Sequence, residues 1–151
     1  QLKMKPHLLE APNALFNRWQ AAGVLCLNTG LTLSRFDPKN TPADDRVQPA
    51  HMALWRPVVQ TILTHLASRA GMSLLLLLWG RPAQNAYVAM CIEAAAKAAG
   101  NAGRVIVVTR PHPGFELTHG EKADSPFLHL PDPYSQANDA LAAAHLPGID
   151  W

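Results

Sequence analysis

Three short apolar runs along the chain predict buried β-strands. They occupy residues 24–28 (VLCLN), 73–80 (SLLLLLWG) and 104–109 (RVIVVT). The first stays apolar until Asn28 at its C-terminal end, which is typical of a strand buried on both faces of a parallel sheet. The second is a leucine run too short for a helix, and the third is rich in β-branched residues. We therefore expect a short parallel sheet.

Two helices are predicted from apolar residues at helical spacing in the first half of the chain. The first spans 11–22, and Gly23 supplies the left-handed residue that commonly ends a helix. The second is expected to begin around 52–56, because Pro57 fits only near a first turn, and to end at Gly71.

Two further helices are expected in the second half. An alanine-rich segment predicts one over 83–99 with Gly100 as its stop, and the last lies near 135–145. Residues 34–49 are rich in proline and charge, so they read as a surface loop. Strands that alternate with helices indicate an α/β layer fold with a parallel sheet, in a single domain over 1–151.

Composition narrows the class of protein only slightly. Hydrophobic residues make up 48% of the chain and charged residues 16%, a low charged fraction, and the net charge is +2. Such a charge is too weak to predict a nucleic-acid partner but is compatible with one. Cys26 and Cys91 lack metal or redox spacing and are expected to be buried thiols. No apolar run approaches the roughly 18 residues of a membrane span.

Ligands of parallel α/β sheets bind at the carboxyl ends of the strands, so the residues that follow each run are the candidate site. These are Asn28 to Gly30, Gly80 to Gln84, and Arg110 to Phe115. An amide, a glycine-bearing turn and a histidine-proline pair would thus meet at one edge.

A series of segments resembles the successive motifs of family-1 uracil-DNA glycosylases. In order they read GVLCLNTGLTLSR, LLLLLWGRPAQ, RPHPG, YSQANDAL and the terminal GIDW. The resemblance covers most of the chain from Trp19 to Trp151. It implies a three-layer αβα sandwich and an enzyme that flips uracil out of DNA and reads the base in a pocket. It also implies that Trp151 is substantially buried and that Asp150 is held by hydrogen bonds or a cation.

Two residues are assigned to the uracil pocket by this resemblance. Asn28 would read uracil, donating to O4 and accepting from N3–H, a pattern that cytosine does not match. Its alternative is a hydrogen bond to the loop that begins at Thr29. His112 would be the catalytic residue, a neutral imidazole that donates to uracil O2 and stabilises the departing base. Its alternative is a loop residue bonded to backbone.

The DNA-binding residues implied by the resemblance are Gly80, Arg81, Gln84, Pro113, Gly114 and Phe115. Arg81 and Gly114 stand where the family has serines that contact phosphates. Arg81 could still bind a phosphate through its charge, or be a solvated loop arginine. Phe115 or Leu117 could wedge into DNA, although the adjacent Glu116 would repel the backbone and Phe115 could instead be a packing residue.

The chain also departs from the family. The segment that carries the family's catalytic aspartate precedes the asparagine strand, and no such segment lies before Asn28. Asp37, Asp44 and Asp45 follow that strand and do not match the motif. The missing segment includes the family's central strand, whose absence would leave backbone groups unpaired. Either an upstream segment or another chain supplies it, which the start at Gln1 favours, or the sheet closes differently.

Two functions follow from these observations. The first is a DNA-binding, uracil-DNA glycosylase-like enzyme that hydrolyses the N-glycosidic bond once an upstream segment or a protein partner completes it, with no metal or organic cofactor. The second is an inactive glycosylase-fold module for DNA binding or protein docking. A third hypothesis is that the chain is an unrelated α/β domain that resembles these motifs by chance. No membrane partner is expected, and in a bacterium the implied location is the cytoplasm with its nucleoid.

Overall fold

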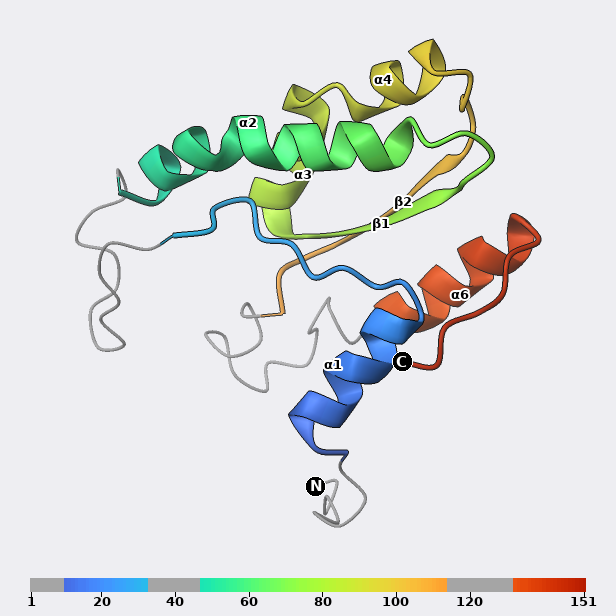
Figure 1. Cartoon of the computed structure of the whole chain (residues 1–151). Helices are drawn as coiled ribbons and strands as arrows, with labels where there is room; N and C mark the ends of the chain where they lie inside the picture. Colours follow the sequence, from blue (N-terminus) through green and yellow to red (C-terminus); the bar gives the residue numbers. More distant parts are fainter. Residues whose placement is uncertain (1–9, 33–46, 114–131) are drawn as a thin grey trace.

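The computed structural model describes residues 10–32, 47–113 and 132–151. Seven elements follow one another in this part of the chain (Figure 1): α1 (Pro12–Ala21), α2 (Val47–Ala67), β1 (Leu74–Trp79), α3 (Gly80–Ala89), α4 (Ile92–Ala98), β2 (Val105–Arg110) and α6 (Pro133–Ala143).

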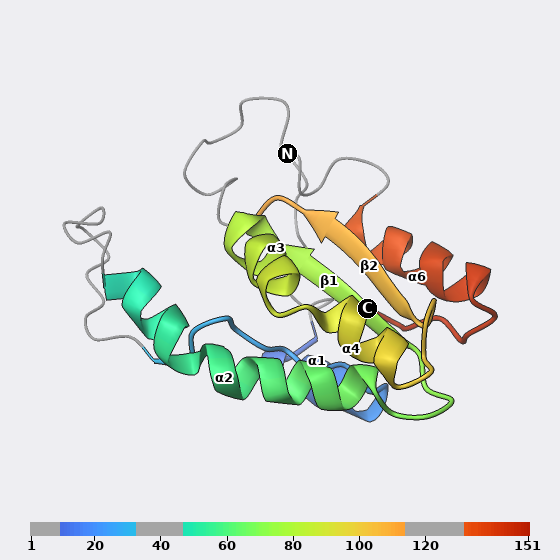
Figure 2. The ribbon, with the colours of Figure 1, turned by 90° about the horizontal axis from the view of Figure 1, so that it is seen from above.

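The two strands form a short parallel sheet, as the sequence predicted. They pair in register from Leu74 opposite Val105 to Trp79 opposite Arg110. Helices α2, α3 and α4 lie over one face of the sheet and α6 lies over the other, with α1 on the same side as α6 (Figures 1 and 2). The protein is therefore a mixed α/β structure with helices on both faces of a two-stranded sheet.

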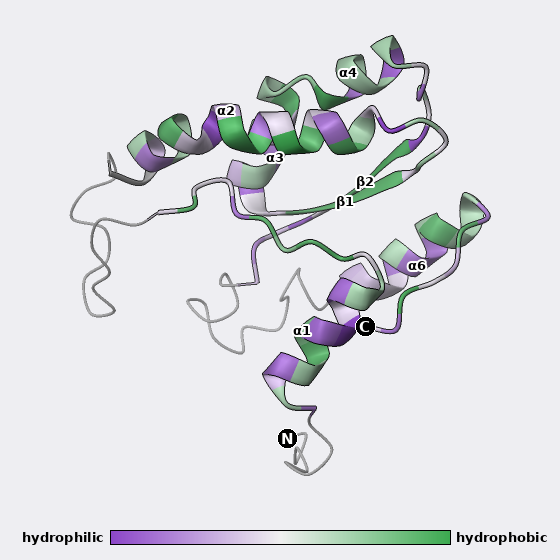
Figure 3. Ribbon diagram, in the orientation of Figure 1, coloured by the Kyte–Doolittle hydropathy of each residue, from purple (hydrophilic) through white to green (hydrophobic). Residues whose placement is uncertain are grey.

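Alternation along β1 assigns its side chains to the two faces. Leu74, Leu76 and Leu78 pack with the core that α2 and α4 supply, whereas the Trp79 ring contacts Tyr134 of α6 on the opposite face. Both strands are hydrophobic over most of their length (Figure 3), consistent with cover on both faces. The buried core on the first face consists of Val59, Ala67, Leu76, Met90, Ile92 and Ala96.

The strand predicted over 24–28 is not formed. These residues follow α1 without helix or strand structure, and Leu25 keeps 61% of its surface exposed. Only Leu27 packs against the core, from its edge. A strand needs a hydrogen-bonded neighbour, and in the described residues β1 pairs with β2 alone. The apolar run is thus an extended strip without a partner strand.

The second helix lies further toward the N-terminus than predicted: it begins at Val47, before the predicted start, and ends at Ala67, so the predicted stop at Gly71 is wrong. Pro49 occupies the first turn that the prediction gave to Pro57. Pro57 lies in the interior, where it supplies no N–H to the helix. Thr61 donates its hydroxyl to the Pro57 carbonyl over 2.8 Å within this part of the helix.

The single helix predicted over 83–99 is two helices, α3 and α4. Cys91 breaks them with a left-handed backbone, φ +54°. Two α2 side chains bind the carbonyls at the break: Arg56 Nη2 donates to Ala89 over 2.6 Å and Gln60 Nε2 donates to Met90 over 3.1 Å. At this break, hydrogen bonds from α2 replace those of a helix, although the alanine-rich sequence favours one continuous helix. Cys26 and Cys91 are exposed free thiols, so the prediction of buried cysteines is wrong.

The glycine stops predicted for two helices are confirmed. Gly23 and Gly100 have φ of +85° and +77°. After each, the chain closes the helix with the paired hydrogen bonds of a Schellman motif, Val24 N to Trp19 O and Asn101 N to Ala96 O among them. None of the described helices is long and apolar enough to cross a membrane.

The last residues are held against the body of the protein. Asn138 accepts from the Ile149 amide and donates to the Ile149 carbonyl, each over 2.9 Å. Arg18 forms an ion pair with Asp150, at 3.0 Å, and also donates to the Asp150 carbonyl. The half-buried ring of Trp151 contacts Trp19 and Tyr134. The expected docking of Trp151 and the expected cation at Asp150 are therefore confirmed, although the ring is only half-buried.

Candidate functional site

The turn between β1 and α3 meets the loop after β2 at the carboxyl edge of the sheet. Gly80 begins α3 with φ +81° and is buried. A Cβ placed on it would lie 3.0 Å from His112 Cβ, so His112 would have to move by a few tenths of an ångström. Two motifs that are far apart in sequence are thus in direct contact here, and the absence of a side chain at Gly80 is what allows it.

Gln84 joins the ends of both strands. Its Nε2 donates to the Arg110 carbonyl over 3.1 Å and lies 3.5 Å from the Leu78 carbonyl. These carbonyls lie at the carboxyl ends of β2 and β1. A half-buried amide on the second turn of α3 therefore supplies a hydrogen-bond donor to them.

Arg110 extends this network to the opposite face of the sheet. Its Nε donates to Gln136 Oε1 on α6 over 3.0 Å. The role of Gln136 is not predicted by the sequence, because it depends on how α6 packs against β2. The only sequence signal is that Gln136 lies within the YSQANDAL segment.

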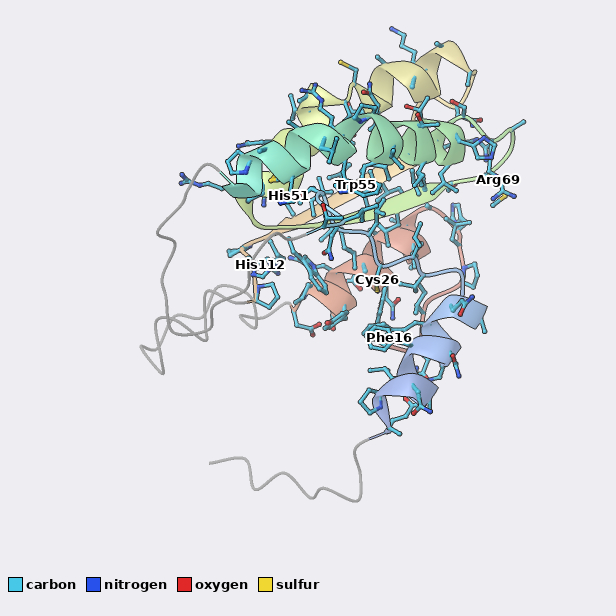
Figure 4. All side chains as sticks on the ribbon, turned by 60° about the vertical axis from the view of Figure 1, so that its left-hand side comes forward. Phe16, Cys26, His51, Trp55, Arg69 and His112 are labelled. Atoms are coloured by element: carbon cyan, nitrogen blue, oxygen red, sulfur yellow. The ribbon has the colours of Figure 1, made fainter. Side chains whose placement is uncertain are left out.

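His112 and Arg81 are both exposed at this edge, whereas Pro113 is half-buried. Figure 4 shows His112 at the end of the sheet opposite to Arg69. Arg81, in the first turn of α3, forms no ion pair with another described residue. Gly114 and Phe115, the other predicted DNA-binding residues, lie outside the described residues, as does Leu117.

Asn28 is not joined to this cluster. It is exposed, and no hydrogen bond connects its side chain to Thr29 or to another described residue. The segment 24–32 is attached instead to α2. Trp55 Nε1 donates to Thr32 Oγ1 over 2.8 Å, and His51 Nδ1 lies 2.7 Å from the same oxygen. The expected convergence of three strand ends is therefore formed by two of them.

Aromatic rings line the sheet face beneath the site. Tyr134 contacts Trp79, the last residue of β1, with ring centroids 6.2 Å apart. Burial raises the pKa of Tyr134, and the nearby Asp132 carboxylate raises it further. The phenol is thus held neutral over the physiological range, as a packing group with a polar end.

Within residues 10–32, 47–113 and 132–151, no cluster of His, Cys, Asp and Glu side chains is arranged to hold a metal ion. The polar side chains exposed at this edge are instead the imidazole of His112 and the guanidinium of Arg81. Such a set suits hydrogen bonding to an anionic or carbonyl-bearing ligand.

Comparison with known proteins adds no assignment. No protein-family model matches the chain, and no curated protein matches it.

Proposed function

We propose that this chain is a uracil-DNA glycosylase-like protein that binds DNA and, when a further segment supplies an aspartate, hydrolyses the N-glycosidic bond of uracil in DNA. The observation that carries the proposal is the contact between the Gly80 turn and His112 at the carboxyl edge of the sheet. The resembling motifs LLLLLWGRPAQ and RPHPG are adjacent there, as a shared pocket requires.

The proposed reaction assigns the leaving base to His112. The bond between C1′ and N1 breaks, and uracil leaves with the bonding electron pair. A neutral imidazole at residue 112 donates to uracil O2 and stabilises the negative charge. Water adds to C1′ and loses its proton to the aspartate of the further segment. Asn28 reads the base, and Arg81 binds a phosphate of the backbone.

An extended segment that inserts beside β1 would complete both the sheet and the site. Support comes from β1, which pairs along one edge only in the described residues, and from residues 24–28, an extended apolar strip without strand partners. Such a segment would pair with β1 and bring its carboxylate to the same edge as His112. This segment would come from an upstream part of the same polypeptide or from a protein partner.

The test is to incubate the full natural protein with a uracil-containing oligonucleotide and to measure abasic sites. We expect cleavage that His112→Ala and Asn28→Ala each reduce at least a hundredfold, whereas His65→Ala, an exposed histidine on the last turn of α2, leaves it unchanged. Cleavage that persists in both His112→Ala and Asn28→Ala would contradict the proposed roles.

A second candidate function is a catalytically inactive module for DNA binding or protein docking. The exposed Asn28, unconnected to the cluster at Gly80, favours it. Titration of uracil-containing and normal duplexes at several salt concentrations separates the two. A backbone binder loses affinity steeply with salt and shows no preference for uracil, whereas a glycosylase-like site prefers the uracil duplex.

A further inference from the structure

The Gln84 amide binds the last residue of β2, where the following loop begins. Its Nε2 binds the Arg110 carbonyl over 3.1 Å, and His112 follows two residues later. The Arg110 side chain is held at the same time by Gln136 on the opposite face. Arg110 is therefore fixed through its carbonyl from one side of the sheet and through its guanidinium from the other.

His112 is fixed from a second direction by the Gly80 turn. Its Cβ lies against the bare Cα of Gly80, and Gln84 belongs to the same helix that Gly80 begins. One short helix thus contacts the loop at two points, the Arg110 carbonyl and the His112 Cβ. Together these contacts restrict the backbone of Pro111, which lies between them, and of His112 itself.

We propose that Gln84 is a positioning residue that sets the direction of the His112 imidazole. The resemblance implied Gln84 as a DNA-binding residue, but its Nε2 lies at the Leu78 and Arg110 carbonyls, so in this proposal it acts through the Arg110 carbonyl and not by contact with DNA. The effect of Gln84 on His112 is inferred from the contacts described above and does not depend on the proposed function. The consequence for uracil binding rests on the proposed function.

The chain offers a matched control in Gln60. Its Nε2 also donates to a backbone carbonyl over 3.1 Å, that of Met90, and the side chain is likewise half-buried. Gln60 joins α2 to the break between α3 and α4, away from the sheet edge. Loss of this bond removes a hydrogen bond of the same kind and length without touching the loop that carries His112.

The experiment measures the His112 ring signals by NMR in the full protein with Gln84→Met, Gln84→Glu and Gln60→Met. Both Gln84 variants keep the side-chain length, and both lose the donor. We expect the His112 signals to shift and broaden in both Gln84 variants and to remain unchanged in Gln60→Met. The His112→Ala variant assigns the signals. Unchanged His112 signals in the Gln84 variants, or equal changes in Gln60→Met, would overturn the proposal.

Affinity for DNA is measured on the same samples, with uracil-containing and normal duplexes as probes. We expect Gln84→Met to reduce the preference for uracil about tenfold, roughly 1.4 kcal/mol, with little change in affinity for normal duplex. A wild-type protein without uracil preference would refute the proposed function and leave the positioning role to be judged by NMR. A wild-type preference that Gln84→Met does not alter would overturn the role of Gln84 in uracil binding.

Discussion

Positive φ angles mark the residues at which this backbone turns most sharply. Gly80 combines such an angle with a close neighbour, the His112 Cβ, which an added Cβ would crowd at 3.0 Å. At Gly23 the angle is similar, but an added Cβ would meet no atom within 4 Å. Substitution at Gly23 therefore carries only the conformational cost of a side chain at positive φ, whereas substitution at Gly80 adds a steric cost.

Gly80→Ala should therefore destabilise the protein more than Gly23→Ala. We expect a loss of about 1 kcal/mol for Gly23→Ala, from the left-handed backbone alone, and of about 2–4 kcal/mol for Gly80→Ala. Urea unfolding followed by circular dichroism measures both. Equal losses would mean that the loop of His112 moves aside freely.

His145 is the opposite case, a residue with a side chain where glycine is favoured. It has φ +58° at the end of α6, and Leu146 N closes the Schellman motif on the Leu141 carbonyl over 2.9 Å. His145→Gly is expected to stabilise the protein by about 1 kcal/mol, because glycine adopts this angle without strain. His145→Ala keeps the strain and serves as control. A thermal-unfolding midpoint that rises equally in both variants would disprove this explanation.

The ends of the elements were only partly predictable from the sequence. The leucine and β-branched runs located β1 and β2 because burial of both faces dictates their composition. The first turn of α6 was also encoded, since Asp132 caps it and Pro133 follows, but the prediction began at Ser135. The break at Cys91 and the failure of 24–28 to form a strand depend on tertiary partners, which no local pattern reveals.

The residues of the candidate site were likewise only partly predictable from the sequence. Gly80, Gln84 and His112 could be predicted to lie close together because they follow parallel strands. The contact between Gly80 and His112 and the bond from Gln84 to the Arg110 carbonyl follow from the observed β1–β2 pairing. Asn28 could not be placed this way, because its run has no partner strand in the described residues.

Asn101 holds the end of α2 against the loop before β2. The side chain is 3% exposed, and Nδ2 donates to the Ala67 and Arg69 carbonyls over 3.0 and 2.6 Å. Asn101→Ala should cost about 2–3 kcal/mol, since two acceptors lose their donor in a buried setting. Denaturant unfolding measures the loss, with the exposed Asn85→Ala as control. A loss below about 0.5 kcal/mol would show that other donors replace Asn101.

The cap of α6 makes part of the stability depend on pH. Hydrogen bonds from the Ser135 hydroxyl and amide, with that from the Tyr134 amide, lower the pKa of Asp132 below its ordinary 3.8. The carboxylate therefore stabilises the folded state above that ordinary value, and this contribution disappears as the pH falls through the lower folded-state pKa.

Asp132→Asn tests this pH dependence, because asparagine caps helices well but does not titrate. We expect the difference in unfolding free energy between the wild type and Asp132→Asn to be constant near neutral pH and to change below about pH 4. Unfolding in urea at a series of pH values measures it. A difference that stays constant down to pH 2 would rule out the carboxylate as its source.

On the scale of the whole molecule, α1 is held by the last residues of the sequence. None of its residues is buried, and its contacts include the Arg18–Asp150 pair and the ring of Trp19 against Trp151. Figure 1 shows these last residues beside α1. Because Asn138 on α6 positions Ile149 and Trp151, it connects α1 indirectly to the sheet.

Asn138→Ala should therefore loosen α1 as well as the last residues. We expect the free energy of unfolding to fall by about 2 kcal/mol. Amide hydrogens in α1 should exchange faster than in the wild type, whereas local opening of β1 should not change. The exposed Asn17→Ala on α1 provides the control. Unchanged exchange in α1 would show that this helix is held independently of the last residues.

The hydrogen bond between Trp55 and Thr32 gives the protein an optical probe of its own. Indole emission responds to the loss of a polar partner at Nε1, and this indole joins α2 to the segment that follows 24–28. A difference spectrum between the wild type and Trp55→Phe isolates its signal from those of the other tryptophans. A strand that inserts beside β1 and displaces this segment should therefore shift the wavelength of the Trp55 emission maximum, and no added label is needed to detect it.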